Sequence, residues 1–287
     1  MEFLKLASAA ICFAAVGCVT AEEGSVDTMT QSIATSNRLA VNRIAVNRLA
    51  ANRIAVNRIA VNRIAANRIA VNRIAVNGAA ADLIETEDGR EVFKYLAECA
   101  IPVGTTLVAT DSQGVAYEFD GAIGLAPRWL DHALNERESR WISACLFSRV
   151  NAHNISVEIS LRGPSRALDV TLEESAEWTL EEGAFYGQYF LPITQPIAWY
   201  ACSGRRVRDA HDRMRDCANP DPDHPGLTMC GFTYAGECGV AASPSSAAAC
   251  ESQSLNGTYY RDCSTGDVFT SEDDSEFSEV ITTFVHP

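Results

Sequence analysis

The pattern of hydrophobic and polar positions beyond residue 84 predicts both helices and strands. Apolar residues recur at helical spacing in the first of these segments, where Val92, Phe93 and Leu96 share one face and Asp88 is placed to cap the N-terminus. Helices are predicted at Asp88–Ala100, Glu136–Val150 and Leu172–Trp178.

Strands are predicted where apolar and polar residues alternate with a period of two, most clearly in Ile155–Leu161. Thr105–Thr110 and Val115–Asp120 flank the turn sequence Asp111–Gly114, so a β-hairpin is expected there. Further strands are predicted at Phe185–Leu191, Ile197–Cys202, Met229–Tyr234 and Glu279–Val285. This mixture indicates a domain of the α+β class with an antiparallel sheet.

The segment from Asn37 to Gly78 follows neither period and repeats every five residues, with eight units that read Asn-Arg-(Ile/Leu)-Ala-(Val/Ala). Five is odd, so a flat strand would turn successive units to opposite faces. A helix would scatter the isoleucines around its axis, because each residue turns it by about 100°. The period suits a β-solenoid of about two coils. The array resembles pentapeptide-repeat proteins in period but not in register. The alternative is a low-complexity or helical spacer.

Composition divides the chain further. The 287 residues are 47 % hydrophobic, enough for one sizeable core with appendages. The expected organisation is an export signal at 1–21, a flexible tether at 22–36, the repeat array at 37–78, an α+β core domain at 79–201 and a cysteine-rich C-terminal region of the same domain at 202–287.

The N-terminal segment is typical of an export signal of the lipoprotein type. Lys5 precedes the apolar stretch Leu6–Gly17, and Ala15–Cys18 resembles a lipobox in which Cys18 is lipidated. Ordinary cleavage after Ala21 is the alternative. The segment is too short for a typical membrane span. We therefore expect a cell-envelope protein anchored in the outer membrane at Cys18, or otherwise a periplasmic or secreted one.

The cysteine content agrees with export, because an even number of cysteines in an exported protein indicates disulfides. One bridge is predicted between Cys99 and Cys145, which both follow helical patterns, and the remaining connectivity stays open. A zinc site is disfavoured by the absence of any CxxC pair. The candidates for four disulfides are Cys99, Cys145, Cys202, Cys217, Cys230, Cys238, Cys250 and Cys263.

Charge is divided sharply along the chain. From Ala80 onward there are 33 acidic and 14 basic residues, a net charge of −19, whereas the array carries arginines and no acid. The basic face either docks on the chain's own acidic domain or meets an anionic polymer or lipid headgroups. No nucleic acid is expected, because no aromatic residues accompany the arginines. The basic face consists of Arg38, Arg43, Arg48, Arg53, Arg58, Arg63, Arg68 and Arg73.

No recognised catalytic motif is present, so catalytic residues stay unknown and no cofactor is expected. The stretch Asp209–His224 is rich in oxygen ligands of the kind that hold Ca²⁺, but the EF-hand spacing is absent and its prolines also fit a solvated loop. We expect no metal there, and the candidate ligands are Asp212, Asp216, Asp221 and Asp223. The glutamates of 173–182 around Trp178 are interpreted as a solvated helix face, and a sugar-binding carboxylate pair is the alternative.

Several short motifs resemble a group of uncharacterised myxobacterial exported proteins that also carry Asn-Arg-(Leu/Ile)-Ala repeats. The motifs are Gly89–Val92, Gly124–Trp129, Arg140–Leu146, Glu182–Gly187 and Cys230–Phe232. The resemblance implies an exported, cysteine-rich protein. It supplies no catalytic residues, because no activity is established for that group.

The sequence therefore predicts a lipid-anchored or secreted cell-envelope protein with a non-enzymatic structural or binding role. The alternative is an exported hydrolase that acts on an envelope or extracellular polymer. A third hypothesis is that the array is a self-assembly element, in which the exposed coil edges of one chain stack on those of another. A buried carboxylate or histidine pair in a cleft would favour the enzyme.

Overall fold

A computed structural model describes residues 84–130, 134–153, 155–190, 197–240, 249–251, 259–264 and 276–287, and two short strands at 34–36 and 39–40. Cys18 and the eight array arginines lie outside the described residues, so the solenoid and the spacer both stay predictions. Within the described part of the chain, no helix is long and apolar enough to cross a membrane.

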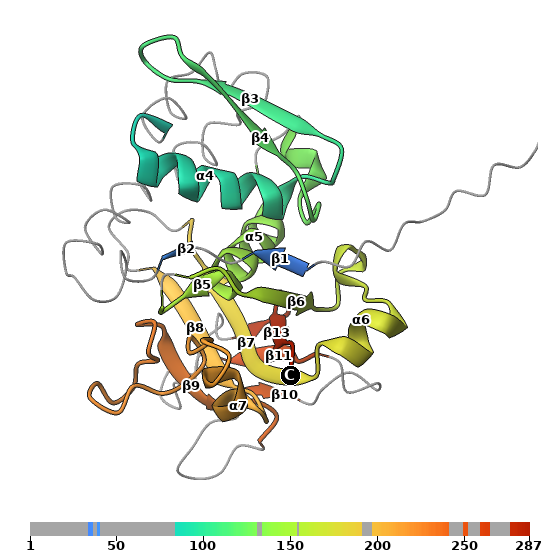
Figure 1. Ribbon diagram of the computed structural model, residues 1–287, viewed down its shortest axis with the longest axis vertical. Helices are drawn as coiled ribbons and strands as arrows, with labels where there is room; N and C mark the ends of the chain where they lie inside the picture. Colours follow the sequence, from blue (N-terminus) through green and yellow to red (C-terminus); the bar gives the residue numbers. More distant parts are fainter. Residues whose placement is uncertain are drawn as a thin grey trace, which may run out of the picture.

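A six-stranded mixed sheet forms the centre of the fold, in the order β1-β6-β13-β7-β8-β9 (Figure 1). Neighbouring strands are antiparallel except β8 and β9, which are parallel. β13, close to the C-terminus, lies between β6 and β7, and all five of its residues are buried. The strands are β1 (Ala34–Ser36), β6 (Glu158–Arg162), β7 (Leu180–Gln188), β8 (Ala198–Ser203), β9 (Thr233–Glu237) and β13 (Ile281–Val285).

Helix α5 (Glu136–Ser148) packs against β7 and β13, and α4 (Glu87–Ala100) packs against α5. The expected hairpin is confirmed as β3 (Thr106–Thr110) and β4 (Ala116–Asp120), and α4 contacts it. Figure 1 shows α5 between the sheet and this outer layer.

Both long helices begin at side-chain caps. Asn135 and Glu138 form a capping box at the start of α5. The expectation that Asp88 caps α4 is wrong, because the Thr86 hydroxyl accepts from the Gly89 N–H and Asp88 lies inside the first turn. The negative charge of Asp88 is still favourable there, since it faces the positive end of the helix dipole.

Shorter elements complete the described fold. They are β2 (Leu39–Ala40), β5 (Val150–Asn151), β10 (Cys250–Glu251), β11 (Arg261–Ser264), β12 (Glu276–Phe277), α6 (Leu172–Glu177), α7 (Val207–His211) and the 3₁₀ turns η2 (Pro127–Leu130) and η3 (Arg166–Leu168). β2, inside the repeat array, pairs with β5 in parallel, and β10, β11 and β12 form a small antiparallel sheet.

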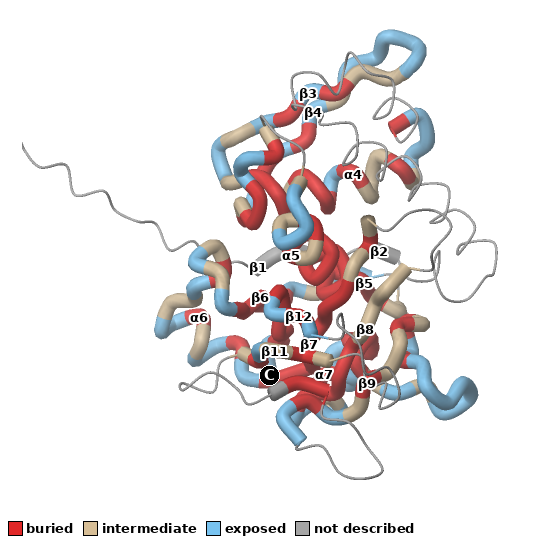
Figure 2. Tube along the Cα trace, turned by 180° about the vertical axis from the view of Figure 1, so that it is seen from behind, coloured by how far each residue is buried: buried red, intermediate tan, exposed pale blue. Residues whose placement is uncertain are grey.

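The buried residues follow the sheet and α5, as the red segments of Figure 2 show. Phe93, Trp129, Phe185 and Phe232 belong to the main core cluster. A second cluster gathers around Tyr186, where the β10–β12 sheet packs against the central one. The arrangement is α+β, as predicted, but the expected antiparallel sheet is mixed, because β8 and β9 are parallel.

Four disulfides connect these layers, and the predicted Cys99–Cys145 bridge is confirmed between α4 and α5. The other three hold the C-terminal region: Cys202–Cys238, Cys217–Cys230 and Cys250–Cys263. Cys202 Sγ lies 3.4 Å from Cys250 Sγ, so two bridges are adjacent where the second core cluster meets β8. The described cysteines are thus all oxidised in pairs.

Candidate functional site

The segment around α7 concentrates positive charge in an otherwise acidic domain. Five of the 14 basic residues beyond Ala80 fall within 205–215. They are Arg205, Arg206, Arg208, Arg213 and Arg215. All but Arg215 are exposed. This cluster was not predicted, although its arginines lie close together in the sequence.

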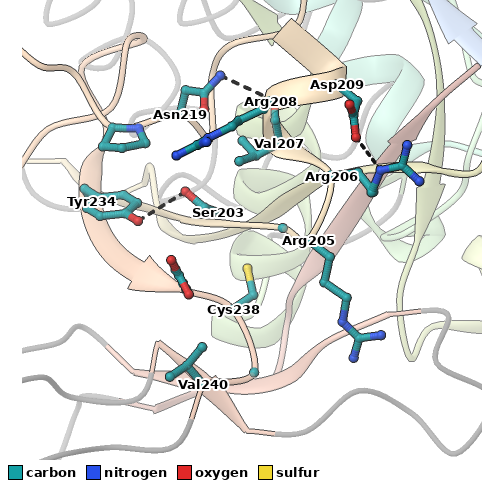
Figure 3. Close-up of a pocket in the computed structure, with 14 residues that line it drawn as sticks. Ser203, Arg205, Arg206, Val207, Arg208, Asp209, Asn219, Tyr234, Cys238 and Val240 are labelled. Carbon is teal, nitrogen blue, oxygen red and sulfur yellow. Dashed lines mark hydrogen bonds and ion pairs between the residues drawn. The ribbon is translucent and has the colours of Figure 1, made fainter. Parts of the chain in front are cut away.

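The same segment borders a pocket of about 620 Å³ (Figure 3). Arg206 is paired with Asp209. Arg205 and Arg208 also line the pocket, and within the described residues neither side chain has a carboxylate partner. In Figure 3 the Arg208 side chain extends toward the Tyr234 side of the pocket, whereas Arg206 turns to Asp209. Among the described residues, Arg205 and Arg208 are thus two pocket-lining arginines whose side chains have no carboxylate partner.

The carboxylates of Asp209 and Glu237 also line the pocket, and neutral polar groups complete its wall. Ser203 Oγ donates to the Ala218 carbonyl over 2.9 Å and lies 3.2 Å from the Tyr234 hydroxyl. Asn219 also lines the pocket. The wall is fixed in place, because Ser203 and Tyr234 belong to the paired strands β8 and β9 and the disulfide at Cys238 follows β9.

Next to this pocket, two histidines converge on one buried carboxylate. Asp216 is 3 % exposed and lies 2.9 Å from His153 Nε2 and 2.8 Å from His211 Nδ1. Asn219 Nδ2 donates to Asp216 Oδ1 over 2.6 Å. Asn219 therefore belongs both to the pocket and to the cluster His153, His211 and Asp216, which we call the His–Asp cluster.

The position of Asp216 is set by its chain neighbours. Arg215 Nε and Nη2 donate to Glu182 Oε2 over 2.9 and 2.6 Å, and both side chains are fully buried. The Cys217 N–H donates to Glu182 Oε1 over 3.1 Å, and Cys217 is bridged to Cys230. The residues on both sides of Asp216 are thus hydrogen-bonded to Glu182 of β7.

This network corrects the interpretation of 173–182 as a solvated helix face. Only Leu172–Glu177 is helical, and Glu181 and Glu182 belong to the buried strand β7. Glu181 accepts from the Tyr260 hydroxyl over 2.7 Å. Glu174 is also buried, and neither of its carboxylate oxygens has a hydrogen-bond partner among the described residues. A strand that is buried on both faces lacks the alternation of apolar and polar residues by which a strand is recognised in the sequence.

Hydrogen bonding changes proton affinity at two histidine–aspartate pairs. The hydrogen bond to Asp216 and the charge of that carboxylate raise the pKa of His211, and Asp212 adds to the effect. The hydrogen bond from His224 lowers the pKa of Asp221, and the Asp223 N–H contributes in the same direction. Both effects favour the charged form of the residue that shifts.

The candidate metal ligands predicted from the sequence are distributed over separate places. Asp216 lies in the His–Asp cluster, whereas Asp221 pairs with His224 over 2.8 Å. Neither Asp212 nor Asp223 is part of a metal-type cluster among the described residues. His153 was not predicted, because it lies 63 residues from Asp216 in the chain.

A second pocket, of about 680 Å³, lies beside α6 and is lined by Arg162. This guanidinium is committed elsewhere: it donates to Ser160 Oγ and the Trp178 carbonyl, and it stacks on Phe284. Burial lowers the pKa of Arg162 to about 10, against the charges of Glu174 and Glu181. The pocket at α7 is the better candidate site, because two of its arginines, Arg205 and Arg208, have no carboxylate partner among the described residues.

No family model, no curated protein and no solved structure matches this chain. The resemblance to the myxobacterial group therefore stays a prediction, and the site is interpreted from its own geometry.

Proposed function

We propose that this chain is an exported, non-enzymatic cell-envelope protein whose disulfide-stabilised domain binds an anionic ligand at Arg205 and Arg208. One observation carries the proposal. The domain has 33 acidic and 14 basic residues beyond Ala80, so carboxylate partners are abundant. Two arginines that line one pocket and have no such partner among the described residues are available for a ligand.

The chemistry of the pocket narrows the ligand class. A guanidinium presents a planar fork of donors that matches carboxylate and phosphate groups. Ser203, Asn219 and Tyr234 add neutral groups that suit hydroxyls, and the carboxylates of Asp209 and Glu237 can accept hydrogen bonds from such hydroxyls. A pocket of about 620 Å³ falls in the usual range for small-molecule sites. An acidic saccharide, with a carboxylate or phosphate on a hydroxyl-rich ring, fits this combination.

The rest of the chain supports an envelope location. Four disulfides are consistent with an exported protein. We propose further that Cys18 carries a lipid anchor and that the array at 37–78 is the basic arm between anchor and domain. The arm meets either an anionic polymer or the domain's own excess negative charge.

The proposal is tested by isothermal titration of the full exported chain with oligogalacturonate, inorganic phosphate and a neutral glucose oligosaccharide. Saturable binding is expected for an anionic probe and not for the neutral one. Binding of oligogalacturonate without phosphate would assign a carboxylated sugar, and the reverse would assign a phosphate group.

The decisive variant is Arg205→Gln/Arg208→Gln, and Arg213→Gln is the matched control, because Arg213 is exposed in the same segment but does not line the pocket. The double variant is expected to bind at least about tenfold more weakly, since each lost charge-assisted hydrogen bond is worth about 1.5–3 kcal/mol. If Arg213→Gln weakened binding of the anionic probe equally, the attraction would be unspecific, and the proposed site at Arg205 and Arg208 would be wrong.

An exported hydrolase is the second candidate, and the His–Asp cluster favours it. A histidine oriented by a buried carboxylate is a common general-base arrangement. If the protein cleaves the saccharide that it binds, His211→Ala is expected to abolish product release as measured by reducing ends, with the binding constant retained. Intact oligosaccharide after prolonged incubation with the unaltered chain would exclude this candidate.

A further inference from the structure

We infer that His153, His211 and Asp216 form a binding site for a divalent transition-metal cation, with Zn²⁺ as the reference ion. The inference rests on convergence. One nitrogen of each histidine and a carboxylate oxygen of Asp216 all lie within 4.8 Å of one another. The three residues come from different places: the turn after β5, the end of α7 and the loop before Cys217.

The donor set selects the class of ion. Two imidazoles and one carboxylate suit zinc and its neighbours, whereas Ca²⁺ and Mg²⁺ prefer oxygen ligands alone. The eight described cysteines are paired in disulfides, so thiolates do not compete for the ion. Histidine and aspartate are the strongest metal ligands left in this part of the molecule.

The geometry needs only a small adjustment. Zinc bonds of about 2.0 Å in a tetrahedral arrangement separate neighbouring donor atoms by about 3.2 Å. Here the nitrogen–oxygen distances are 2.9 Å for His153 and 2.8 Å for His211. A cation would replace the hydrogen bonds that now join the histidines to Asp216, and each of these nitrogen–oxygen distances would lengthen by a few tenths of an ångström.

Access and support also fit an ion site. The His211 side chain is 59 % exposed and His153 is 27 % exposed, so an ion can enter from solvent. Three protein ligands leave a fourth position for water. Asn219 is not itself a proposed ligand, but it donates a hydrogen bond to Asp216. Hydrogen bonds of this kind orient carboxylates that bind a metal. The Asp212 charge next to His211 adds to the attraction for a cation.

The test is a titration of the untagged full chain with ZnCl₂, in competition with a chromophoric chelator. We expect one Zn²⁺ per chain at this site. His211→Ala and His153→Ala are each expected to weaken binding at least about tenfold, the usual effect of losing a metal ligand or its support. Asp216→Asn should weaken Zn²⁺ binding to the same extent if the variant folds. If it does not fold, His211→Ala still tests the site, because the His211 side chain is exposed.

The chain provides its own control. His224 lies 2.8 Å from Asp221 and forms a single surface histidine–aspartate pair. His224→Ala is therefore expected to bind Zn²⁺ like the unaltered chain. Co²⁺ in place of Zn²⁺ should give the intense visible absorption of a tetrahedral site, which disappears in His211→Ala.

Two outcomes would overturn the inference. One is the absence of stoichiometric Zn²⁺ binding, which would leave the three residues a proton-linked cluster only. The other is a loss in His224→Ala that equals the losses in His153→Ala and His211→Ala. The result is independent of the proposed saccharide site, because Arg205→Gln/Arg208→Gln is expected to retain Zn²⁺.

Discussion

The buried pair of Glu182 and Arg215 gives the sharpest test of how the candidate site is held. Neither side chain is exposed, and two hydrogen bonds of 2.9 and 2.6 Å join them. Arg215 also donates to the Val150 carbonyl and, over 3.0 Å, to that of Ser148. Thr283 Oγ1 donates to Glu182 over 2.8 Å. The Glu182–Arg215 pair thus connects β7, β13, the end of α5 and the loop that carries Asp216.

Glu182→Gln removes the negative charge and retains the shape, so it leaves the Arg215 charge buried without compensation. The loss expected from breaking a buried pair is about 3–5 kcal/mol. The hydrogen bonds give a similar value, since two charge-assisted bonds at about 1.5–3 kcal/mol each are weakened. A domain is stable by only about 5–15 kcal/mol, so this is a large fraction of the total.

The assay is urea unfolding of the oxidised chain, followed by tryptophan fluorescence. Glu182→Gln, Arg215→Met and the double variant form a mutant cycle. The double variant is expected to lose no more than the worse single variant, because removal of the charge removes the need for its partner. A loss below about 1 kcal/mol for Glu182→Gln, or strictly additive losses in the cycle, would refute this reasoning.

Three further outcomes are expected. Replacing Cys99 and Cys145 together by alanine opens a loop of 46 residues and should lower the free energy of unfolding by about 4 kcal/mol. The loss is measured from the shift of the urea transition, and a loss below about 1 kcal/mol would contradict the loop-entropy argument. An NMR titration should find the pKa of Asp221 below its ordinary value of 3.8 and higher in His224→Ala than in the unaltered chain. Because the folded-state pKa is lowered, the pair stabilises the fold above pH 3.8 and loses this contribution as pH falls through the folded value; an Asp221 pKa unchanged by the substitution would speak against the pair. Cys18→Ser should release the protein from membranes in cell fractionation, and unchanged membrane association would exclude the lipid anchor.

Local signals account for the elements that the sequence predicted. The α4 and α5 segments combine apolar spacing with capping residues, and the hairpin is marked by the turn Asp111–Gly114. The strand β7 was placed five residues too late, at 185 rather than 180. Both of its faces are covered, so it lacks the polar alternation that marks a half-buried strand. α7 has only five residues, too few for a helical period to appear.

The candidate site was less accessible to sequence reasoning. The arginines of 205–215 form a local cluster that an inspection of charge along the domain could have found. The His–Asp cluster could not be found that way, because the distance between His153 and Asp216 is set by the packing of β5 against the loop that Arg215 and Cys217 fix. The positions of the two residues in the sequence do not predict such a contact.

The central proposal, an anionic saccharide held at Arg205 and Arg208, is tested most directly by a crystal structure of the full exported chain with oligogalacturonate bound. The proposal predicts the ligand in the α7 pocket, with a carboxylate within hydrogen-bond distance of at least one of these two guanidinium groups. Oligogalacturonate bound on another surface, with both arginines facing solvent, would contradict it.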